Sequence, residues 1–223
     1  MKQTLFITGT DTGVGKTVLT VLLANFLRER GVNVAALKPV CSGNRNDARK
    51  IFAAMDGELS LNEINPWHFR AAVAPTLAAK LEKKSVKLSQ SLAHVRAMQK
   101  RFDVLLVEGA GGLLSPLGEG FNSRDLISAL RAIPIVVAQN KIGAVNQVLL
   151  TLEALPKNLR AKARVVLMSP SKPDSSTDSN AKLLGQFFGP QKILSLPRLA
   201  VNFTAVYVLE NSSVRRTLQA LTI

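Results

Sequence analysis

Short, almost unbroken apolar runs alternate along the chain with longer segments whose apolar residues recur at helical spacing. Runs such as LFIT, VLLV and RVVLM contain few polar positions, which is typical of parallel strands buried on both faces. The pattern predicts strands at residues 4–8, 33–37, 103–107, 135–138, 164–168 and 192–196. It predicts helices at residues 16–30, 47–55, 89–101, 124–131, 143–155, 181–188 and 213–221. This alternation favours an α/β fold, with a doubly wound, mainly parallel sheet flanked by helices.

The 223 residues are expected to form one domain, residues 1–223. Two segments fit the alternation poorly. Residues 65–87 look like an insertion between the second and third strands, and the Ser/Pro/Asp-rich residues 169–180 are typical of a mobile loop. Ligands of such sheets bind beyond the carboxyl ends of the strands, so the loops that follow the strands are the candidate functional segments.

Composition narrows the class of protein. A hydrophobic fraction of 47% supports a large core. A single cysteine, Cys41, excludes an internal disulfide framework and indicates a reduced, cytoplasmic setting. The two histidines, His68 and His94, lack the spacing of a metal site. The apolar N-terminal run is too short for a signal sequence and is interpreted as the first strand.

A formal net charge of +14 raises nucleic acid, anionic membrane or acidic ligands as partners. Residues 80–101 hold seven basic side chains and one acid, and residues 156–164 hold four more basic ones. Neither stretch interleaves aromatic residues or contains a nucleic-acid-binding signature. We interpret both as solvated helix faces, and expect neither a nucleic acid nor a membrane partner.

The strongest chemical signal is GTDTGVGKT, residues 9–17, between the first predicted strand and helix. Backbone N–H groups of such a glycine-rich loop, together with the start of the helix, cradle phosphate oxygens. Lys16 can neutralise phosphate charge, and the Thr17 hydroxyl suits Mg²⁺. The loop has one residue more than the usual G-x4-G-K-[ST] pattern, because Thr10 stands at the expected first glycine.

Two further loops carry charged groups to the same edge. Lys38 follows the second strand, in KPVCSG, and either stabilises a transferred phosphoryl group or is a solvated lysine. Glu108 ends the third strand, in VEGAGG, where a carboxylate can reach Mg²⁺. Asp47 is a second metal-ligand candidate or merely an acid in the first helical turn. Cys41 is interpreted as a packing residue, because no histidine lies near it in sequence.

These motifs together resemble dethiobiotin synthase, a family of P-loop NTPase-like, ATP-dependent ligases of biotin biosynthesis. The family's G-T-x-T-x-x-G-K-T, K-P-V-x-S-G and V-E-G-A-G-G motifs match residues 9–17, 38–43 and 107–112. Its N-P-[YW]-x-F and K-[LI]-G-x-[IV]-N segments match residues 65–69 and 141–146. The resemblance runs from residue 3 to about residue 155.

The resemblance implies an activity: carboxylation and ring closure of 7,8-diaminononanoate with CO₂, ATP and Mg²⁺, through a carbamate and a carbamic–phosphoric mixed anhydride. It also implies a homodimer with the substrate site at the subunit interface. The residues that it assigns to catalysis are Lys16, Lys38 and Thr12, and those that it assigns to Mg²⁺ are Thr17, Asp47 and Glu108. The nucleotide would contact Gly13, Val14, Gly15, Lys16, Thr17, Val18, Ser169, Pro197 and Leu199. The diamine would contact Thr12, Ser42, Gly111, Gly112, Gly143 and Asn146.

In this family an asparagine usually reads the nucleotide base where this chain has Ser169, and a histidine usually stands where it has Gln147. Two alternatives share the expected fold. One is a ligase related to corrin biosynthesis, which generally needs a glutamine-amidotransferase domain for which 223 residues leave no room. The other is a partition or positioning ATPase that acts on DNA or membrane; its loop usually carries a second lysine, which residues 10–14 lack.

Overall fold

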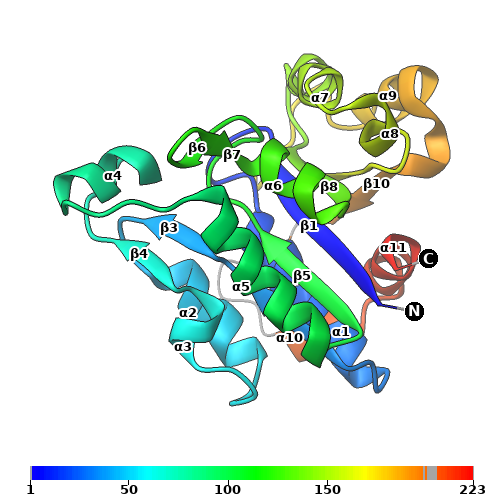
Figure 1. The fold of residues 1–223 in the computed structure, drawn as a ribbon. Coiled ribbons are helices and arrows are strands. Elements are labelled where there is room, and N and C mark those ends of the chain that lie inside the picture. The colour runs from blue at the N-terminus through cyan, green and yellow to red at the C-terminus, as the bar shows by residue number, and fades with distance from the viewer. Residues whose placement is uncertain (1, 198, 200–204, 223) are drawn as a thin grey trace.

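A six-stranded, fully parallel sheet forms the centre of the molecule (Figure 1). The computed structural model describes residues 2–197, 199 and 205–222. The strands lie in the order β10–β9–β8–β1–β5–β2. Their bounds, which confirm the six predicted strands, are β1 Gln3–Gly9, β2 Val34–Leu37, β5 Val104–Glu108, β8 Ile133–Gln139, β9 Arg164–Met168 and β10 Ile193–Leu196.

Strand β1 is the point at which the strand order reverses. It pairs with β5 on one side, where Leu5 lies opposite Leu106, and with β8 on the other, where Ile7 lies opposite Ile135. From β1 the chain goes to the edge strand β2, returns to β5 beside β1, and then continues outward on the other side through β8, β9 and β10. Ligands of such sheets bind at this reversal, beyond the carboxyl ends of the strands.

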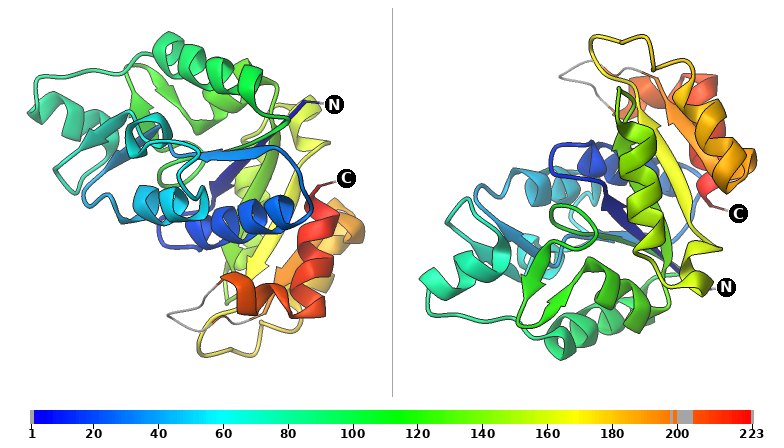
Figure 2. Two further views of the ribbon diagram at one scale, coloured as in Figure 1. Left: turned by 90° about the horizontal axis from the view of Figure 1, so that it is seen from below. Right: turned by 90° about the horizontal axis from the view of Figure 1, so that it is seen from above.

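Helices cover both faces of the sheet (Figure 2). Helix α1 packs with α10 and α11 on one face, whereas α5 and α6 pack together on the other, against β5 and β1. The helices predicted from the sequence are all present, as α1 Lys16–Glu29, α2 Asn46–Ala54, α5 Leu88–Arg101, α6 Ser123–Leu130, α7 Ala144–Glu153, α9 Asn180–Phe188 and α11 Ser212–Leu221. Their buried residues join those of the sheet in one hydrophobic core.

Several short elements were not predicted. Strand β3 Val40–Ser42 pairs with β4 Trp67–Phe69, and β6 Pro116–Gly118 pairs with β7 Phe121–Asn122. The additional short helices are α3 Leu61–Ile64, α4 Pro75–Leu81, α8 Lys157–Arg160, the 3₁₀ turn η1 Pro190–Lys192 and α10 Ala205–Leu209. Residues of β3, β4, α4, β6 and β7 share a second, smaller core. The expected insertion, residues 65–87, is thus a folded cap beside the main sheet.

The loop at residues 169–180, which the sequence marks as mobile, is tied to the start of α7. The Ile142 N–H donates to the Asp174 carboxylate at 2.8 Å. Asn140 is buried and donates to the Thr177 carbonyl at 2.9 Å, and Asn180 donates to the Asn140 side chain at 2.9 Å. These hydrogen bonds give the loop a defined path in spite of its polar composition. Among the described residues, no helix is long and apolar enough to cross a membrane.

Candidate functional site

The glycine-rich loop joins β1 to α1 at the carboxyl edge of the sheet. Gly15 caps α1 in a left-handed conformation, with φ 103°, and Gly13 has φ 70°. Side chains rarely adopt these values, so glycine is required at both positions. A Cβ on Gly9 would lie 2.7 Å from the Val14 side chain. The loop therefore folds tightly, and its N–H groups at the start of α1 are placed to bind an anion.

Lys16 begins α1 and is 94% buried, with 6% of its surface exposed. Its ammonium donates to the Asp11 carbonyl at 2.7 Å, across the loop. Burial and the nearby Lys38 ammonium lower the pKa of Lys16 to about 8. The loop thus holds a cation that is destabilised unless an anion approaches it.

A second buried cation, Lys38, lies between two carboxylates. It follows β2, and its Nζ donates to Glu108 Oε1 at 2.5 Å and to Asp47 Oδ2 at 2.9 Å. Glu108 ends β5 and also accepts from the hydroxyls of Thr17 and Thr20, both at 2.8 Å. The structure therefore brings together four sequence-predicted residues, Lys38, Thr17, Asp47 and Glu108, in one hydrogen-bonded cluster.

The charges of this cluster stabilise one another. Burial of Lys38 opposes its charge, but Glu108 and Asp47 outweigh this effect, so its pKa is raised. Burial also opposes the charge of Asp47, and again Lys38 outweighs it, so the Asp47 pKa is lowered. Lys38 and Asp47 are consequently charged at neutral pH, and Lys38 donates to both carboxylates of the cluster.

The same cluster fits the chemistry of a magnesium site. Thr17, Asp47 and Glu108 supply oxygen atoms only, the donor type that Mg²⁺ prefers. The Lys38 ammonium already stands between the two carboxylates, which shows that the cluster accommodates positive charge. Asp47, in the first turn of α2, is partly exposed and faces the adjoining cavity. Within the described part of the chain, no group of three or more His, Cys, Asp or Glu side chains could hold a metal.

A cavity of about 540 Å³ opens beside the phosphate loop. Lys16 and Lys38 line one wall, and Thr12 and Ser42 carry hydroxyls into its lining. Ser42 donates to the Val73 carbonyl at 2.5 Å, which ties the end of β3 to the segment before α4. The predicted diamine contact Gly111 also lines this cavity, with φ 68°.

A buried polar network behind the cavity was missed by sequence reasoning about function. Asn65 is fully buried and donates to the Lys38 carbonyl at 2.7 Å. The side-chain amide oxygen of Asn65 accepts from Arg45 Nε at 2.9 Å and from Cys41 Sγ at 3.3 Å. Burial raises the pKa of the Cys41 thiol, in agreement with a packing role. The resemblance had marked residues 65–69, but not that Asn65 fixes the backbone that carries Lys38.

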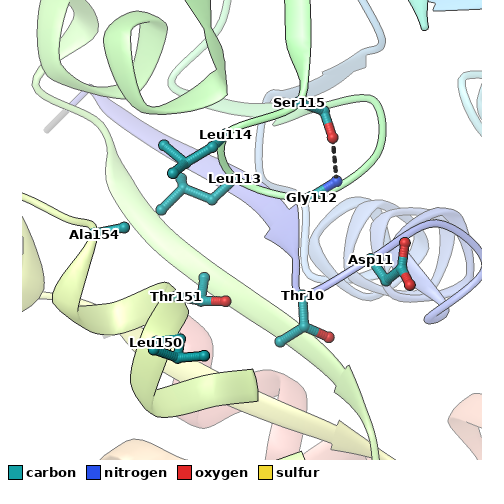
Figure 3. A pocket seen from close by; sticks show the side chains of 9 residues that line it. All are labelled: Thr10, Asp11, Gly112, Leu113, Leu114, Ser115, Leu150, Thr151 and Ala154. Carbon is teal, nitrogen blue, oxygen red and sulfur yellow. Dashed lines mark hydrogen bonds between the residues drawn. The ribbon is translucent and has the colours of Figure 1, made fainter. Parts of the chain in front are cut away.

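A second cavity, of about 430 Å³, lies on the other side of the phosphate loop (Figure 3). Leu113 and Leu114 face it from the glycine-rich turn after β5, and Leu150 faces it from α7. Gly112, a predicted diamine contact, lies at its rim, where its N–H donates to the Ser115 hydroxyl at 2.9 Å. Leu114 and Leu150 are 50% and 63% exposed, so two exposed leucines border this cavity.

Two predicted nucleotide contacts outside the phosphate loop, Ser169 and Pro197, follow the carboxyl ends of the adjacent strands β9 and β10. The Ser169 N–H donates to the Leu196 carbonyl at 3.1 Å, which places Ser169 beside Pro197. Leu199 and Val18 pack partly buried against the main core. The Met168 side chain approaches Gly15 closely enough that a Cβ there would lie 3.0 Å from it.

The last two predicted diamine contacts, Gly143 and Asn146, lie apart from these cavities. Gly143 caps α7 with φ 85°, and Asn146 lies in the first turn of α7. Both are exposed, and neither lines the two cavities beside the phosphate loop. Within one chain they are therefore separate from Lys16 and Lys38.

Comparison with solved structures shows the fold. The chain superposes on a ParA family ATPase from Chlorobium tepidum with a TM-score of 0.60 and 12% identity, covering all of both chains. It superposes on a chain of the MinC:MinD cell division complex from Aquifex aeolicus with a TM-score of 0.62 and 14% identity, covering 98% of this chain and 93% of that one. The predicted doubly wound, P-loop NTPase-like architecture is confirmed.

Comparison of sequences shows the family. Residues 3–202 match a family model described as an AAA domain. The ATP-dependent dethiobiotin synthetase BioD of Anaeromyxobacter sp. is 39% identical over 197 residues, which cover 86% of this chain and 88% of the relative. The enzyme of the same name from Bacillus licheniformis is 34% identical over 200 residues, covering 87% and 85%. The chain belongs to the ATP-dependent dethiobiotin synthetase family, and with it to the ATP-binding ligases of biotin biosynthesis.

Proposed function

We propose that this chain carboxylates 7,8-diaminononanoate with CO₂ and closes the ureido ring at the expense of ATP. The observation that carries the proposal is the shared cavity of Lys16, Lys38, Thr12 and Ser42, next to the phosphate loop. Two buried ammonium groups beside two hydroxyls suit a ligand that carries both a carbamate and a transferable phosphoryl group.

Three bond changes make up the reaction. One amine of the substrate attacks CO₂ and loses a proton, which gives a carbamate. A carbamate oxygen then attacks the γ-phosphorus of ATP, and ADP leaves. The second amine attacks the carbamoyl carbon, inorganic phosphate leaves, and a second proton is released as the ring closes. No residue forms a covalent bond, so positioning and electrostatic stabilisation supply the catalysis.

Each residue of the cluster has a role in this scheme. The N–H groups of residues 13–18 and the Lys16 ammonium bind the phosphate chain. Lys38 stabilises the negative charge that develops on the transferred phosphoryl group. Thr17, Asp47 and Glu108 would hold Mg²⁺, which neutralises phosphate charge when bound. Thr12 and Ser42 would orient the amine and the carbamate, with Gly111 leaving room for them.

The nucleotide base would lie over Ser169, Pro197 and Leu199. The side chain of Ser169 is shorter than that of asparagine and carries a hydroxyl in place of an amide. A hydroxyl both donates and accepts at a single oxygen atom, whereas an amide donates from its nitrogen and accepts at its oxygen. Such a contact discriminates less between bases than an amide does. We therefore propose that the chain accepts other nucleoside triphosphates more readily than relatives that carry asparagine there.

The active unit would be a homodimer of a cytoplasmic enzyme. Gly143 and Asn146, at the start of α7, do not line the cavity beside the cluster in one chain but would serve the site of a second chain. Ile142 is 75% exposed and Leu150 is 63% exposed, and a second copy would cover both. The free N–H groups at the start of α7 would then hold the substrate carboxylate.

A phosphate-release assay tests the proposed reaction. Purified protein is given diaminononanoate, bicarbonate and Mg²⁺, with ATP, CTP or GTP in parallel. Diamine-dependent phosphate release and dethiobiotin detected by mass spectrometry are the expected result. The proposal is refuted if the diamine does not increase phosphate release with ATP, CTP or GTP. Release with CTP or GTP at a rate near that with ATP would support the weak base discrimination assigned to Ser169.

A further inference from the structure

The amino-terminal edge of the sheet carries a row of cations that the proposed reaction does not use. In a parallel sheet all strands begin at the same edge, which here is opposite the phosphate loop. Basic residues stand at or just before the starts of β1, β8, β9 and β10, and at the end of α5. We name this set the basic edge; its members are Lys2, Lys100, Arg131, Lys162, Arg164 and Lys192.

Contacts fix the members of the basic edge near one another. Lys2 Nζ donates to the carbonyls of Gln99 and Lys100, at 2.9 and 2.7 Å, which joins the start of β1 to the end of α5. Lys162, Arg164 and Lys192 line a cavity of about 300 Å³ together with Ile133, the first residue of β8. The row therefore continues from α5 across four adjacent strands.

Two of these cations are held in place by the backbone. Lys192 donates to the Ala161 carbonyl at 2.8 Å and lies over the Phe188 ring, 4.8 Å from its centre. Arg164 donates to the Lys162 carbonyl at 3.3 Å. Each keeps further N–H groups for a ligand. Less conformational entropy is lost when such fixed side chains bind an anion.

The basic edge is uncompensated, in contrast to the neighbouring surface. Towards β2, Arg28 pairs with Glu58 and Arg101 pairs with Glu63, at 2.7 Å each. Among the residues that the structure describes, no carboxylate lies within 4 Å of a basic-edge cation. Two exposed acids stand near this edge: Asp103, just before β5, and Glu153, at the end of α7, which pairs with Arg160 of α8. Because Arg160 balances Glu153, the six cations of the basic edge face one remaining acid, Asp103, and create a positive strip.

In contrast to the expectation from the sequence pattern, we propose that the basic edge binds the phosphodiester backbone of duplex nucleic acid, independently of sequence. Neighbouring strands lie about 4.8 Å apart, so β1 to β10 spread the cations along about 15 Å. A row of this kind suits a linear polyanion, whereas a bilayer presents its charge in two dimensions. Lys192 covers the Phe188 ring, so base stacking is not the mode of binding. The nucleotide site faces the opposite edge and stays accessible.

Fluorescence anisotropy with a labelled 30-base-pair duplex of arbitrary sequence tests this proposal. We compare the wild type with Lys100→Glu/Lys162→Glu, in which two exposed basic-edge residues are reversed. The matched control is Lys80→Glu/Lys182→Glu, which changes the net charge equally. Both control residues are exposed; Lys80 is on α4, and Lys182 is in the first turn of α9, which follows the loop at the carboxyl end of β9.

The wild type is expected to bind with a log Kobs against log[salt] slope of about −5, because about six phosphates are neutralised. The basic-edge variant should bind at least tenfold more weakly at 50 mM salt and with a shallower slope. The control should stay within twofold of the wild type. Equal weakening in the two variants, or no binding by the wild type at 50 mM salt, would overturn the proposal.

Two further measurements separate competing explanations. Thermal unfolding and ATP-dependent phosphate release should be the same in the wild type and the basic-edge variant; if that variant unfolds, Lys100→Gln/Lys162→Gln takes its place with the same expectation. Sedimentation with phosphatidylglycerol vesicles probes a membrane. If the wild type binds the vesicles, the basic-edge variant does not, and neither binds the duplex, the basic edge binds a lipid surface. That result would contradict the proposal.

Discussion

The charge on Lys16 should destabilise the protein whenever no phosphate is bound. Burial and Lys38 lower its pKa from 10.5 to about 8. A difference of one in pKa corresponds to about 1.4 kcal/mol, so holding Lys16 protonated at pH 7 costs about 3 kcal/mol of folding free energy. Lys16→Met removes this cost. It also removes the hydrogen bond to the Asp11 carbonyl, which offsets about 1 to 2 kcal/mol of the gain.

The pH dependence isolates the charge from the lost hydrogen bond. Between pH 8 and 10.5 the unfolded chain keeps the Lys16 proton and the folded chain loses it, so this group makes the wild type more stable as the pH rises. At pH 9.5 the cost is about 1.4 kcal/mol, about 2 kcal/mol less than at pH 7. Methionine does not titrate. The free energy of unfolding of Lys16→Met relative to the wild type should therefore fall by about 2 kcal/mol between the two pH values.

Urea unfolding followed by far-ultraviolet circular dichroism measures this difference. Lys80→Met on α4 is the control, because it removes the positive charge of an exposed lysine instead of a buried one. Without ligand at pH 7, Lys16→Met should be more stable than the wild type. With MgATP the wild type should become the more stable of the two, since the triphosphate stabilises only a loop that keeps Lys16. A difference between Lys16→Met and the wild type that is the same at pH 7 and pH 9.5 would refute the argument that burial of the charge is costly.

Three other substitutions test the Lys38 cluster, the Asn65 network behind the cavity and the exposed Leu150 of α7. Lys38→Ala should lower kcat for diamine-dependent phosphate release by about 10²- to 10³-fold, as loss of one transition-state donor does; an unchanged kcat would remove Lys38 from the reaction. Asn65→Ala should lower the free energy of unfolding by about 2 to 4 kcal/mol in urea titrations, because the Lys38 carbonyl and Arg45 lose a buried partner. A loss below about 0.5 kcal/mol would contradict this. Leu150→Glu, on the exposed face of α7, should halve the mass measured by sedimentation equilibrium, and an unaltered mass would exclude this face from the dimer.

Local sequence signals were sufficient for the main sheet and the phosphate loop. A strand buried on both faces is a run of apolar residues, and each of the six runs folded as such a strand. GTDTGVGKT is likewise contiguous, and the left-handed Gly13 and Gly15 reflect a requirement that only glycine meets. In both cases the determining residues are neighbours in the chain, so the pattern can be seen without the fold.

Elements of two or three residues gave no such signal. Strands β3, β4, β6 and β7 are too short to show a period of two, and they form because a second small core gathers them. The Asn65 network joins residues 20 to 27 positions apart. The contact of Lys38 with Glu108 spans 70 positions. Such pairings depend on which strands become neighbours, a choice that the topology makes and that no local pattern contains.

The distribution of charge between the two edges of the sheet explains why composition was a poor guide to function. At the carboxyl edge, Lys16 and Lys38 are matched by Asp47 and Glu108, so this cluster has no net charge before a ligand binds. Under the proposed function, a triphosphate would bind through Mg²⁺ and the loop N–H groups rather than through a general excess of cations. The +14 charge is consequently not a property of the nucleotide site. Its uncompensated part at the basic edge lies where the strands begin, and a ligand there would contact residues that the reaction never uses.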